Sequence, residues 1–188
     1  MFFTTKNDVR KYIKTHIPPL DIKENKDKRI NEKLISSPYY KKASCVLSYM
    51  ALKDEVFIDN SKIDKDIFIP KVDLETTTMN FYKYTNDTIL ENGAYNITEP
   101  KENSNKFSFN KSYENILVIV PGRAFTKEGK RIGRGKGYYD KFLSLLLQNY
   151  NKDNVTLLGI AYKEQILEDI PFESHDIKMD LVITDWSL

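Results

Sequence analysis

The order of three segments between residues 116 and 150 constrains the fold most. Ile116–Val120 contains only β-branched residues and leucine, which is typical of a buried strand. A glycine-rich basic loop follows, and apolar residues from Tyr138 to Tyr150 then recur with helical spacing. This order of strand, loop and helix places a helix N-terminus beside the loop, and such an N-terminus binds anions.

The remaining apolar segments predict an α/β fold. One helix is expected from a cap at Thr4 or Thr5 to Pro18, and a second at Asn25–Ile35. Further strands are expected at Cys45–Met50, Ile67–Val72, Met79–Tyr84, Thr156–Tyr162 and Leu181–Thr184. Several of these are apolar on both faces, so we expect an open mixed, largely parallel sheet with helices on both faces. Parallel neighbours would bring the loops after Met50 and Val120 to the same ligand-binding rim.

The chain length fits one domain. The 188 residues are enough for one substantial core, so residues 1–188 are expected to form a single domain. The stretch at about 85–113 is rich in Asn, Lys, Glu and Ser, which predicts a polar surface insertion. We expect it to be ordered around Tyr95–Pro100 and mobile from Lys101 to Asn110.

Composition and charge narrow the class of protein. The chain has a net charge of +2, which argues against general nucleic-acid binding. Its one cysteine, Cys45, lies in an apolar run and is expected to be a buried structural thiol in a reducing compartment. No run approaches the roughly 20 apolar residues of a membrane span. The N-terminus lacks the layout of a secretory signal. These features predict a cytoplasmic enzyme, with a mitochondrial location left open.

The loop itself has the composition of a polyphosphate site. Residues 121–141 include seven basic and two acidic side chains. Gly133, Gly135 and Gly137 alternate with Arg134 and Lys136. Glycines let backbone N–H groups approach phosphate oxygens, while guanidinium and ammonium groups neutralise them. The Walker and dinucleotide patterns both fail here, because their required glycine and hydroxyl positions do not match. From the loop alone, a solvated turn and a nucleic-acid contact remain alternatives.

Several segments together resemble one family. The loop Arg131–Asp140, preceded by Pro121-Gly122 and Ala124-Phe125, closely resembles the signature of 5-formyltetrahydrofolate cyclo-ligases, also called methenyltetrahydrofolate synthetases. Other segments agree in the family's order: Lys6 and Arg10, Tyr49–Glu55, Phe68–Lys71, Met79–Tyr82, Asn96–Pro100, Tyr162–Ile166 and His175–Asp180. The resemblance therefore spans nearly the whole chain.

The resemblance implies an ATP- and Mg²⁺-dependent ligase. In its reaction ATP phosphorylates the formyl oxygen of 5-formyltetrahydrofolate, N10 attacks the formyl carbon, and phosphate leaves to give 5,10-methenyltetrahydrofolate. The family pattern assigns catalysis to Arg134, Lys136 and Tyr138. It assigns ATP binding to Lys6, Arg10, Arg131, Gly133, Arg134, Gly135, Lys136, Gly137 and Tyr139. The expected partner is the small-molecule folate substrate alone, without nucleic acid or membrane, and the protein is expected to be a monomer.

The resemblance also implies a folate site and a metal site. Substrate contacts fall on Met50, Glu55, Tyr95, Gly135, Lys136 and Tyr138, with Glu55 accepting hydrogen bonds from the pterin. Asp140 and Asp176 match the metal positions, and Asp180 is a less favoured third candidate. Gln165 is expected to form part of the wall near the reacting centre. Taken singly, each of these residues also has an ordinary structural explanation, such as a helix cap or a surface charge.

Two residues depart from the family pattern, and two other functions are weighed. Arg123 stands where an apolar residue is common, and Thr126 where aspartate is common, so the first half of the loop is expected to be held differently. A non-catalytic folate-binding module is the alternative function, and an RNA-binding module is a third. The intact ATP and metal positions argue against the folate-binding module. In an RNA-binding module the carboxylates Glu55, Asp140 and Asp176 would have no purpose.

Overall fold

The computed structural model describes residues 2–101 and 105–186. Its centre is a six-stranded sheet with the strand order β10-β9-β6-β1-β2-β3. The strands are β1 (Cys45–Leu47), β2 (Asp66–Asp73), β3 (Thr78–Lys83), β6 (Ile116–Pro121), β9 (Val155–Ala161) and β10 (Leu181–Thr184). All neighbouring pairs are parallel except β2 and β3. The predicted mixed, largely parallel sheet is thus confirmed.

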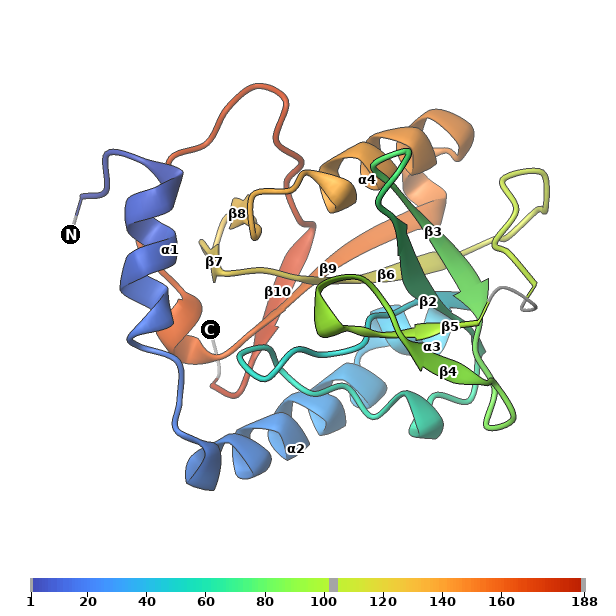
Figure 1. Ribbon diagram of the computed structural model, residues 1–188, viewed down its shortest axis with the longest axis horizontal. Helices are drawn as coiled ribbons and strands as arrows, with labels where there is room; N and C mark the ends of the chain where they lie inside the picture. The colour runs from blue at the N-terminus through green and yellow to red at the C-terminus, as the bar shows by residue number, and fades with distance from the viewer. Residues whose placement is uncertain (1, 102–104, 187–188) are drawn as a thin grey trace.

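Helices cover both faces of this sheet, as predicted (Figure 1). Helix α4 (Tyr138–Asn149) packs on one face, while α2 (Leu20–Ser36) and α3 (Pro38–Lys42) pack on the other. Helix α2 begins five residues before the predicted Asn25, directly after Pro19, whose extended backbone marks the helix start. Prolines are common at helix starts because their fixed φ suits the first turn and their missing N–H is not needed there.

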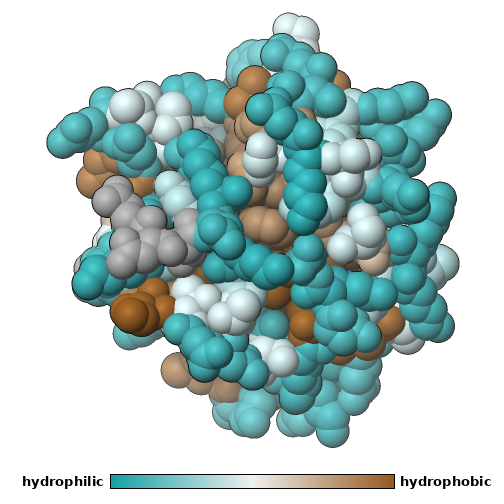
Figure 2. Space-filling model, turned by 90° about the vertical axis from the view of Figure 1, so that its right-hand side faces the viewer, coloured by the Kyte–Doolittle hydropathy of each residue, from teal (hydrophilic) through white to brown (hydrophobic). Residues whose placement is uncertain are grey.

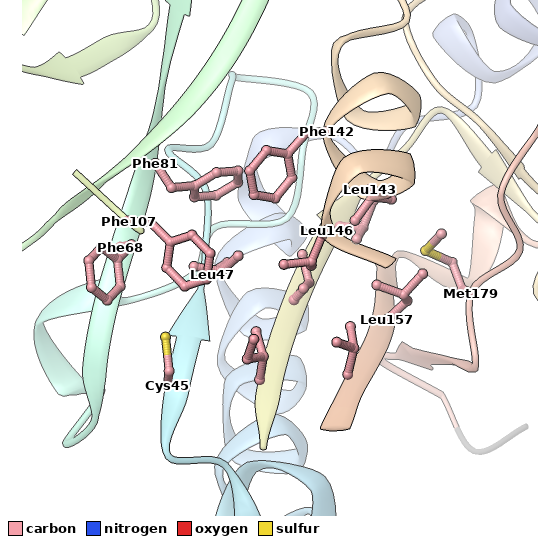
Figure 3. Packing of buried hydrophobic residues seen from close by; sticks show 14 of the residues in the cluster. Cys45, Leu47, Phe68, Phe81, Phe107, Phe142, Leu143, Leu146, Leu157 and Met179 are labelled. Atoms are coloured by element: carbon pink, nitrogen blue, oxygen red, sulfur yellow. The ribbon is translucent and has the colours of Figure 1, made fainter. Parts of the chain in front are cut away.

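Aromatic and aliphatic side chains fill the layer between α4 and the sheet (Figure 3). The rings of Phe81 and Phe142 face each other at a centroid distance of 4.5 Å. Cys45 lies in the same layer and is fully buried, so the predicted structural thiol is confirmed. Burial of these side chains stabilises the fold by roughly 25 cal/mol for each Å² of apolar surface removed from water.

The polar segment 85–113 is partly structured. It contains the short strands β4 (Leu90–Asn92) and β5 (Thr98–Pro100), which pair antiparallel, and the turn η2 (Ala94–Asn96) between them. Two of its rings, Phe107 and Tyr113, are buried in the main core. Of the stretch 101–110 that was expected to be mobile, residues 102–104 lie outside the described residues.

Helix α1 and a short hairpin flank the glycine loop. Helix α1 (Lys6–Lys14) starts at Thr5, whose side-chain oxygen accepts a hydrogen bond from the Asp8 N–H at 3.2 Å. Its buried face, Val9 and Ile13, packs on a hairpin of β7 (Ala124–Phe125) and β8 (Arg131–Ile132). Figure 1 shows α1 beside this hairpin at one end of the sheet. The hairpin was not predicted, because two-residue strands have no measurable hydrophobic period.

The remaining elements are three short 3₁₀ turns, and the exterior is polar. The turns are η1 (Asn60–Lys62), η3 (Lys152–Asn154) and η4 (Lys163–Gln165). Hydrophilic residues cover most of the face in Figure 2, with hydrophobic residues in smaller patches between them. In the part of the chain that the structure describes, no helix has the length and apolar character needed to cross a membrane.

Candidate active site

One cavity lies at the rim of the sheet where β1 and β6 end. These strands are parallel neighbours, so the loops after them meet at the same edge, as the sequence predicts. The cavity has a volume of about 860 Å³. All the residues that the resemblance assigns to catalysis, ATP binding and substrate contact line it, together with the two favoured metal positions. They come from five separate segments of the chain: Lys6, Arg10, Met50, Glu55, Tyr95, Arg131, Gly133, Arg134, Gly135, Lys136, Gly137, Tyr138, Tyr139, Asp140 and Asp176.

The glycine loop leads into the N-terminus of α4 at the cavity wall. Gly135 and Gly137 have φ angles of +92° and +72°, which side chains with a Cβ rarely adopt. Gly137 is the N-cap residue of α4 and offers no side chain to bond the first N–H groups of the helix. Those donors and the helix dipole are therefore available to an anion.

Helix α1 brings two basic side chains to the same loop. The Nε of Arg10 donates to the Gly133 carbonyl at 2.8 Å, and the Arg10 guanidinium packs beside Gly135. A Cβ at Gly135 would lie 3.2 Å from the Arg10 guanidinium carbon, so a side chain there would press on it. The spacing of Lys6 and Arg10 predicted a shared helix face. The structure shows that this face lines the cavity.

The two candidate metal ligands are each held by a basic residue. Asp140 accepts from the Nη2 of Arg131 at 2.8 Å, and both oxygens of Asp176 accept from the Nζ of Lys6 at 2.7 and 2.8 Å. Burial by itself would raise the pKa of Asp176, but the hydrogen bonds from Lys6 and the Glu173 N–H hold that pKa below its usual range. The Asp176 carboxylate is therefore charged at neutral pH.

Asp180 and Gln165 lie elsewhere than the sequence analysis expected. Asp180 bonds the Nζ of Lys152 at 2.6 Å and the N–H of Leu157 at 2.7 Å, and it is not among the cavity-lining residues. Gln165 is buried and donates to the carbonyls of Gly122 and Arg123, so it supports the turn after β6 and does not form the wall. Neither residue is therefore among those that line the cavity, and the sequence did not indicate which way either side chain points.

Carboxylates and one arginine form the other side of the cavity. Glu55 is only 9% exposed, and its two oxygens accept from the Leu52 N–H at 3.0 Å and from the Nε of Arg134 at 2.8 Å. Asp54 also bonds Arg134 and, through its second oxygen, Arg123. Arg134 therefore reaches across the cavity from the glycine loop to the segment after β1.

An aromatic group from the β4–β5 hairpin reaches the glycine loop. The Nζ of Lys136 lies 5.7 Å from the ring centroid of Tyr95, and the Tyr95 and Tyr138 hydroxyl oxygens are 3.3 Å apart. That hydrogen bond raises the pKa of Tyr138. Tyr95 itself has a positive φ of 58°, so its backbone is held in the left-handed region. Tyr95 thus connects the polar segment to the loop.

The departures from the family pattern have local partners. Arg123 forms the ion pair with Asp54 described above. Thr126 is buried, and its hydroxyl oxygen accepts from the Lys130 N–H at 3.3 Å, which supports the turn between β7 and β8. Each departing residue therefore has a polar partner within the site or its supporting hairpin.

Two acidic lining residues were missed by the sequence analysis. Asp54 adjoins Glu55, and its proximity in the sequence was the available signal. Glu99 is 2% exposed and accepts from the Val72 N–H at 3.1 Å. Burial raises the pKa of Glu99. Glu99 stands out only because the folded chain buries it. In the sequence it is one acidic residue in a polar stretch, and nothing there indicates its burial.

Comparisons with known proteins agree with this geometry. A model of the 5-formyltetrahydrofolate cyclo-ligase family matches residues 5–185. The chain is 33% identical to a probable 5-formyltetrahydrofolate cyclo-ligase of Schizosaccharomyces pombe, with 95% of this chain and 94% of the relative covered. It is 30% identical to 5-formyltetrahydrofolate cyclo-ligase of Mus musculus, with 82% and 79% covered.

Solved structures give the same result. The 5,10-methenyltetrahydrofolate synthetase of Aquifex aeolicus superposes with a TM-score of 0.76 at 28% identity, covering 97% of this chain and 90% of that one. The corresponding enzyme of Mycoplasma pneumoniae gives 0.70 at 25% identity, covering 97% and 100%. Since the family model spans nearly the whole sequence and the fold agrees over the same length, the chain belongs to the 5-formyltetrahydrofolate cyclo-ligase family.

Proposed function

We propose that the protein converts 5-formyltetrahydrofolate to 5,10-methenyltetrahydrofolate with the cleavage of ATP to ADP and phosphate, and that the reaction requires Mg²⁺. The observation that carries this proposal is that residues from five distant segments, selected by the family pattern, line one cavity. Convergence of this kind supports a shared site, because unrelated surface charges would be scattered over the molecule.

The glycine-loop side of the cavity suits the nucleotide. The α4 N-terminus and the amides of Gly133–Gly137 offer donors to phosphate oxygens, and Lys6, Arg10, Arg131 and Lys136 offer positive charge. Among the described residues, Arg10 and Lys136 have no carboxylate within ion-pair distance, so their charges are available to phosphate groups. Tyr139 lies next to this helix start.

The donor set also suits magnesium. Mg²⁺ prefers oxygen ligands and keeps several waters, so one or two carboxylates together with phosphate oxygens are enough. Asp140 and Asp176 are such carboxylates and line the cavity. Within the described ranges, no cluster of three or more metal-ligating side chains occurs, which fits a metal held partly by the nucleotide. Bound there, Mg²⁺ would neutralise charge on the phosphates.

The opposite side suits the folate. Glu55 offers carboxylate oxygens to pterin N–H donors, Met50 adds an apolar contact, and Tyr95 offers a ring for stacking. Lys136 of the glycine loop and Tyr138 at the start of α4 both lie beside Tyr95, where the two substrates would meet.

The chemistry needs positioning and charge neutralisation more than a protein nucleophile. The formyl oxygen takes the γ-phosphoryl group and ADP leaves. The N10 lone pair then attacks the formyl carbon and N10 releases its proton to water. The bond between that carbon and its oxygen breaks, and inorganic phosphate leaves. Arg134 and Lys136 would stabilise the charge on the transferring phosphoryl group, and the Tyr138 hydroxyl would orient the formyl oxygen.

A spectrophotometric assay tests the proposal. The protein is mixed with ATP, Mg²⁺ and 5-formyltetrahydrofolate, and the absorbance of methenyltetrahydrofolate is followed. We expect product only when all three are present. Absence of product beside an active control enzyme would contradict the proposal. Calorimetry that then found folate binding without ATP binding would instead favour a non-catalytic folate-binding module.

A further inference from the structure

Four charged side chains form a continuous ion-pair chain across the cavity. Arg123 bonds one oxygen of Asp54, Arg134 bonds the other, and Arg134 also bonds Glu55. The side chains of Arg123 and Glu55 are largely buried, at 15% and 11% exposed, so the ends of the chain are shielded from solvent. Shielded pairs are screened less by salt than surface pairs.

In this arrangement the folate side and the nucleotide side of the cavity compete for the same two side chains, Glu55 and Arg134. Under the proposed function, Glu55 must accept hydrogen bonds from the folate, whereas Arg134 must act on the phosphoryl group. In the structure Arg134 occupies one oxygen of Glu55, and the Leu52 N–H occupies the other. With Glu55 only 9% exposed, there is little room for further donors. A folate that bonds Glu55 therefore competes with Arg134 for the same carboxylate.

The backbone around Arg134 permits this side chain to leave Glu55. Gly133 and Gly135 flank it, and Gly135 already has a φ of +92°. Short glycine-flanked segments are common hinges in enzymes.

Asp54, in contrast, is anchored. Arg123 bonds it directly, and the Arg123 carbonyl is fixed by the side-chain N–H of Gln165 at 3.1 Å. Asp54 can therefore retain Arg134 after the bond to Glu55 opens.

We propose that Asp54, anchored by Arg123, positions Arg134 for exchange between Glu55 and the phosphoryl group, so that folate binding at Glu55 frees Arg134 for the nucleotide. The inference rests on the proposed function. It adds a coupling between the two sites and a role for Asp54 and Arg123, to which the resemblance assigns no role. Because coupling between sites is reciprocal, each substrate strengthens the binding of the other by the same factor.

The experiment measures this coupling directly. The β,γ-imido analogue of ATP is titrated by calorimetry with Mg²⁺ present, with and without saturating 5-formyltetrahydrofolate. For the unmodified protein we expect the analogue to bind about five-fold or more tightly when the folate is present. In Glu55→Gln the Arg134 pair is weakened, so the analogue alone should bind nearly as tightly as it does to the folate-bound unmodified protein.

Asp54→Asn tests the positioning role. It removes the anchor of Arg134, so kcat should fall at least ten-fold, the folate KM should change much less, and the coupling factor should approach one. Asp169→Asn is the matched control, since it removes the same charge from an exposed ion pair with Lys130 outside the cavity. It should keep kcat and coupling, and circular dichroism should show that all variants fold.

The outcomes separate this inference from the proposed function. If the unmodified protein forms methenyltetrahydrofolate but folate leaves the affinity for the ATP analogue unchanged, the exchange of Arg134 is wrong and the function stands. The positioning role is wrong if Asp54→Asn behaves like Asp169→Asn. If the protein forms no product and binds no ATP analogue, both proposals fall.

Discussion

Lys6 and Asp176 are 170 positions apart in the sequence, yet the Nζ of Lys6 lies 2.8 and 2.7 Å from the two carboxylate oxygens of Asp176. Their side chains are 20% and 10% exposed, so the pair is mostly shielded from water. It connects α1 to the segment before β10 at the rim of the cavity. The ion pair therefore joins the nucleotide contact and the metal ligand of the proposed function.

Replacement of Lys6 should cost stability in a pH-dependent way. In Lys6→Met, Asp176 loses its ammonium partner, and we expect unfolding to become easier by about 1–3 kcal/mol at pH 7. Because the folded-state pKa of Asp176 is lowered, the stabilisation is present above its unfolded pKa of about 4 and is lost as the pH falls through the folded value.

Urea unfolding at pH 7 and below pH 4 checks this expectation. The difference between Lys6→Met and the unmodified protein should shrink at the lower pH. Lys11→Met makes the same change at an exposed position of α1 and should have little effect at either pH. A difference that stays constant with pH would show that the ion pair is not its cause.

Replacement of Lys136 should remove catalysis without affecting the fold. Lys136 is exposed, and its ammonium group contacts the Tyr95 ring and no carboxylate among the described residues. Lys136→Ala should lower kcat by about 100-fold or more, because charge on the phosphoryl group is no longer neutralised. Steady-state assays and thermal melts measure both effects. Lys127→Ala, an exposed lysine of the same segment outside the cavity lining, should retain activity; equal activity of the two variants would argue against the role of Lys136.

Removal of the Tyr162 hydroxyl should destabilise the protein most at neutral pH. That hydroxyl donates to the Oδ1 of Asp27 at 2.5 Å. Burial raises the pKa of Asp27, and the bonds from Tyr162 and the Phe57 N–H oppose this rise. Because the pKa of Asp27 is higher in the folded state, the folded protein loses stability as the pH rises from the unfolded to the folded pKa. Above that interval Asp27 is ionised in the folded protein.

In Tyr162→Phe the ionised Asp27 loses a stabilising donor, so we expect a loss of about 1–2 kcal/mol at pH 7. The loss should be smaller once Asp27 binds a proton at acidic pH. Tyr150→Phe is the control, because the Tyr150 hydroxyl bonds the Lys111 carbonyl, which does not titrate. Its effect, measured by the same urea unfolding series, should not depend on pH between 4 and 7.

Cys45 should be unreactive while the protein is folded. The thiol is fully buried, and burial raises its pKa to about 12. An aromatic disulfide reagent at pH 8 should therefore label no thiol in the native protein and one in guanidinium. Ser36→Cys, at an exposed position near the end of α2, should add one rapidly labelled thiol. Rapid labelling of the unmodified protein would contradict the core placement of Cys45.

Much of the fold was predictable because its signals are local. Val46 and Leu117 belong to strands that are apolar on both faces, and this pattern alone indicates a parallel sheet between two helical layers. Thr5 was one of two predicted caps, and its hydroxyl does cap α1. The rim position of the glycine loop followed from the parallel strands.

The partners of charged residues were not predictable in this way. Arg134 was assigned to phosphate by its neighbours in the loop, yet it bonds Asp54 and Glu55, which lie 80 and 79 positions away. The contribution of Tyr113 to the core was also hidden, because the stretch around it is polar. Neither contact has a signature within a short window of sequence.

The sequence by itself determined the largely parallel sheet, its helical layers and the chemical character of the loop at the rim, since hydrophobic periodicity, glycine and charge act over a few residues. Only the tertiary structure decided that α1 lines the cavity, that Lys6 faces Asp176 and that Arg134 reaches Glu55. Those contacts depend on how the helices and the β7–β8 hairpin pack together, and packing depends on the whole chain.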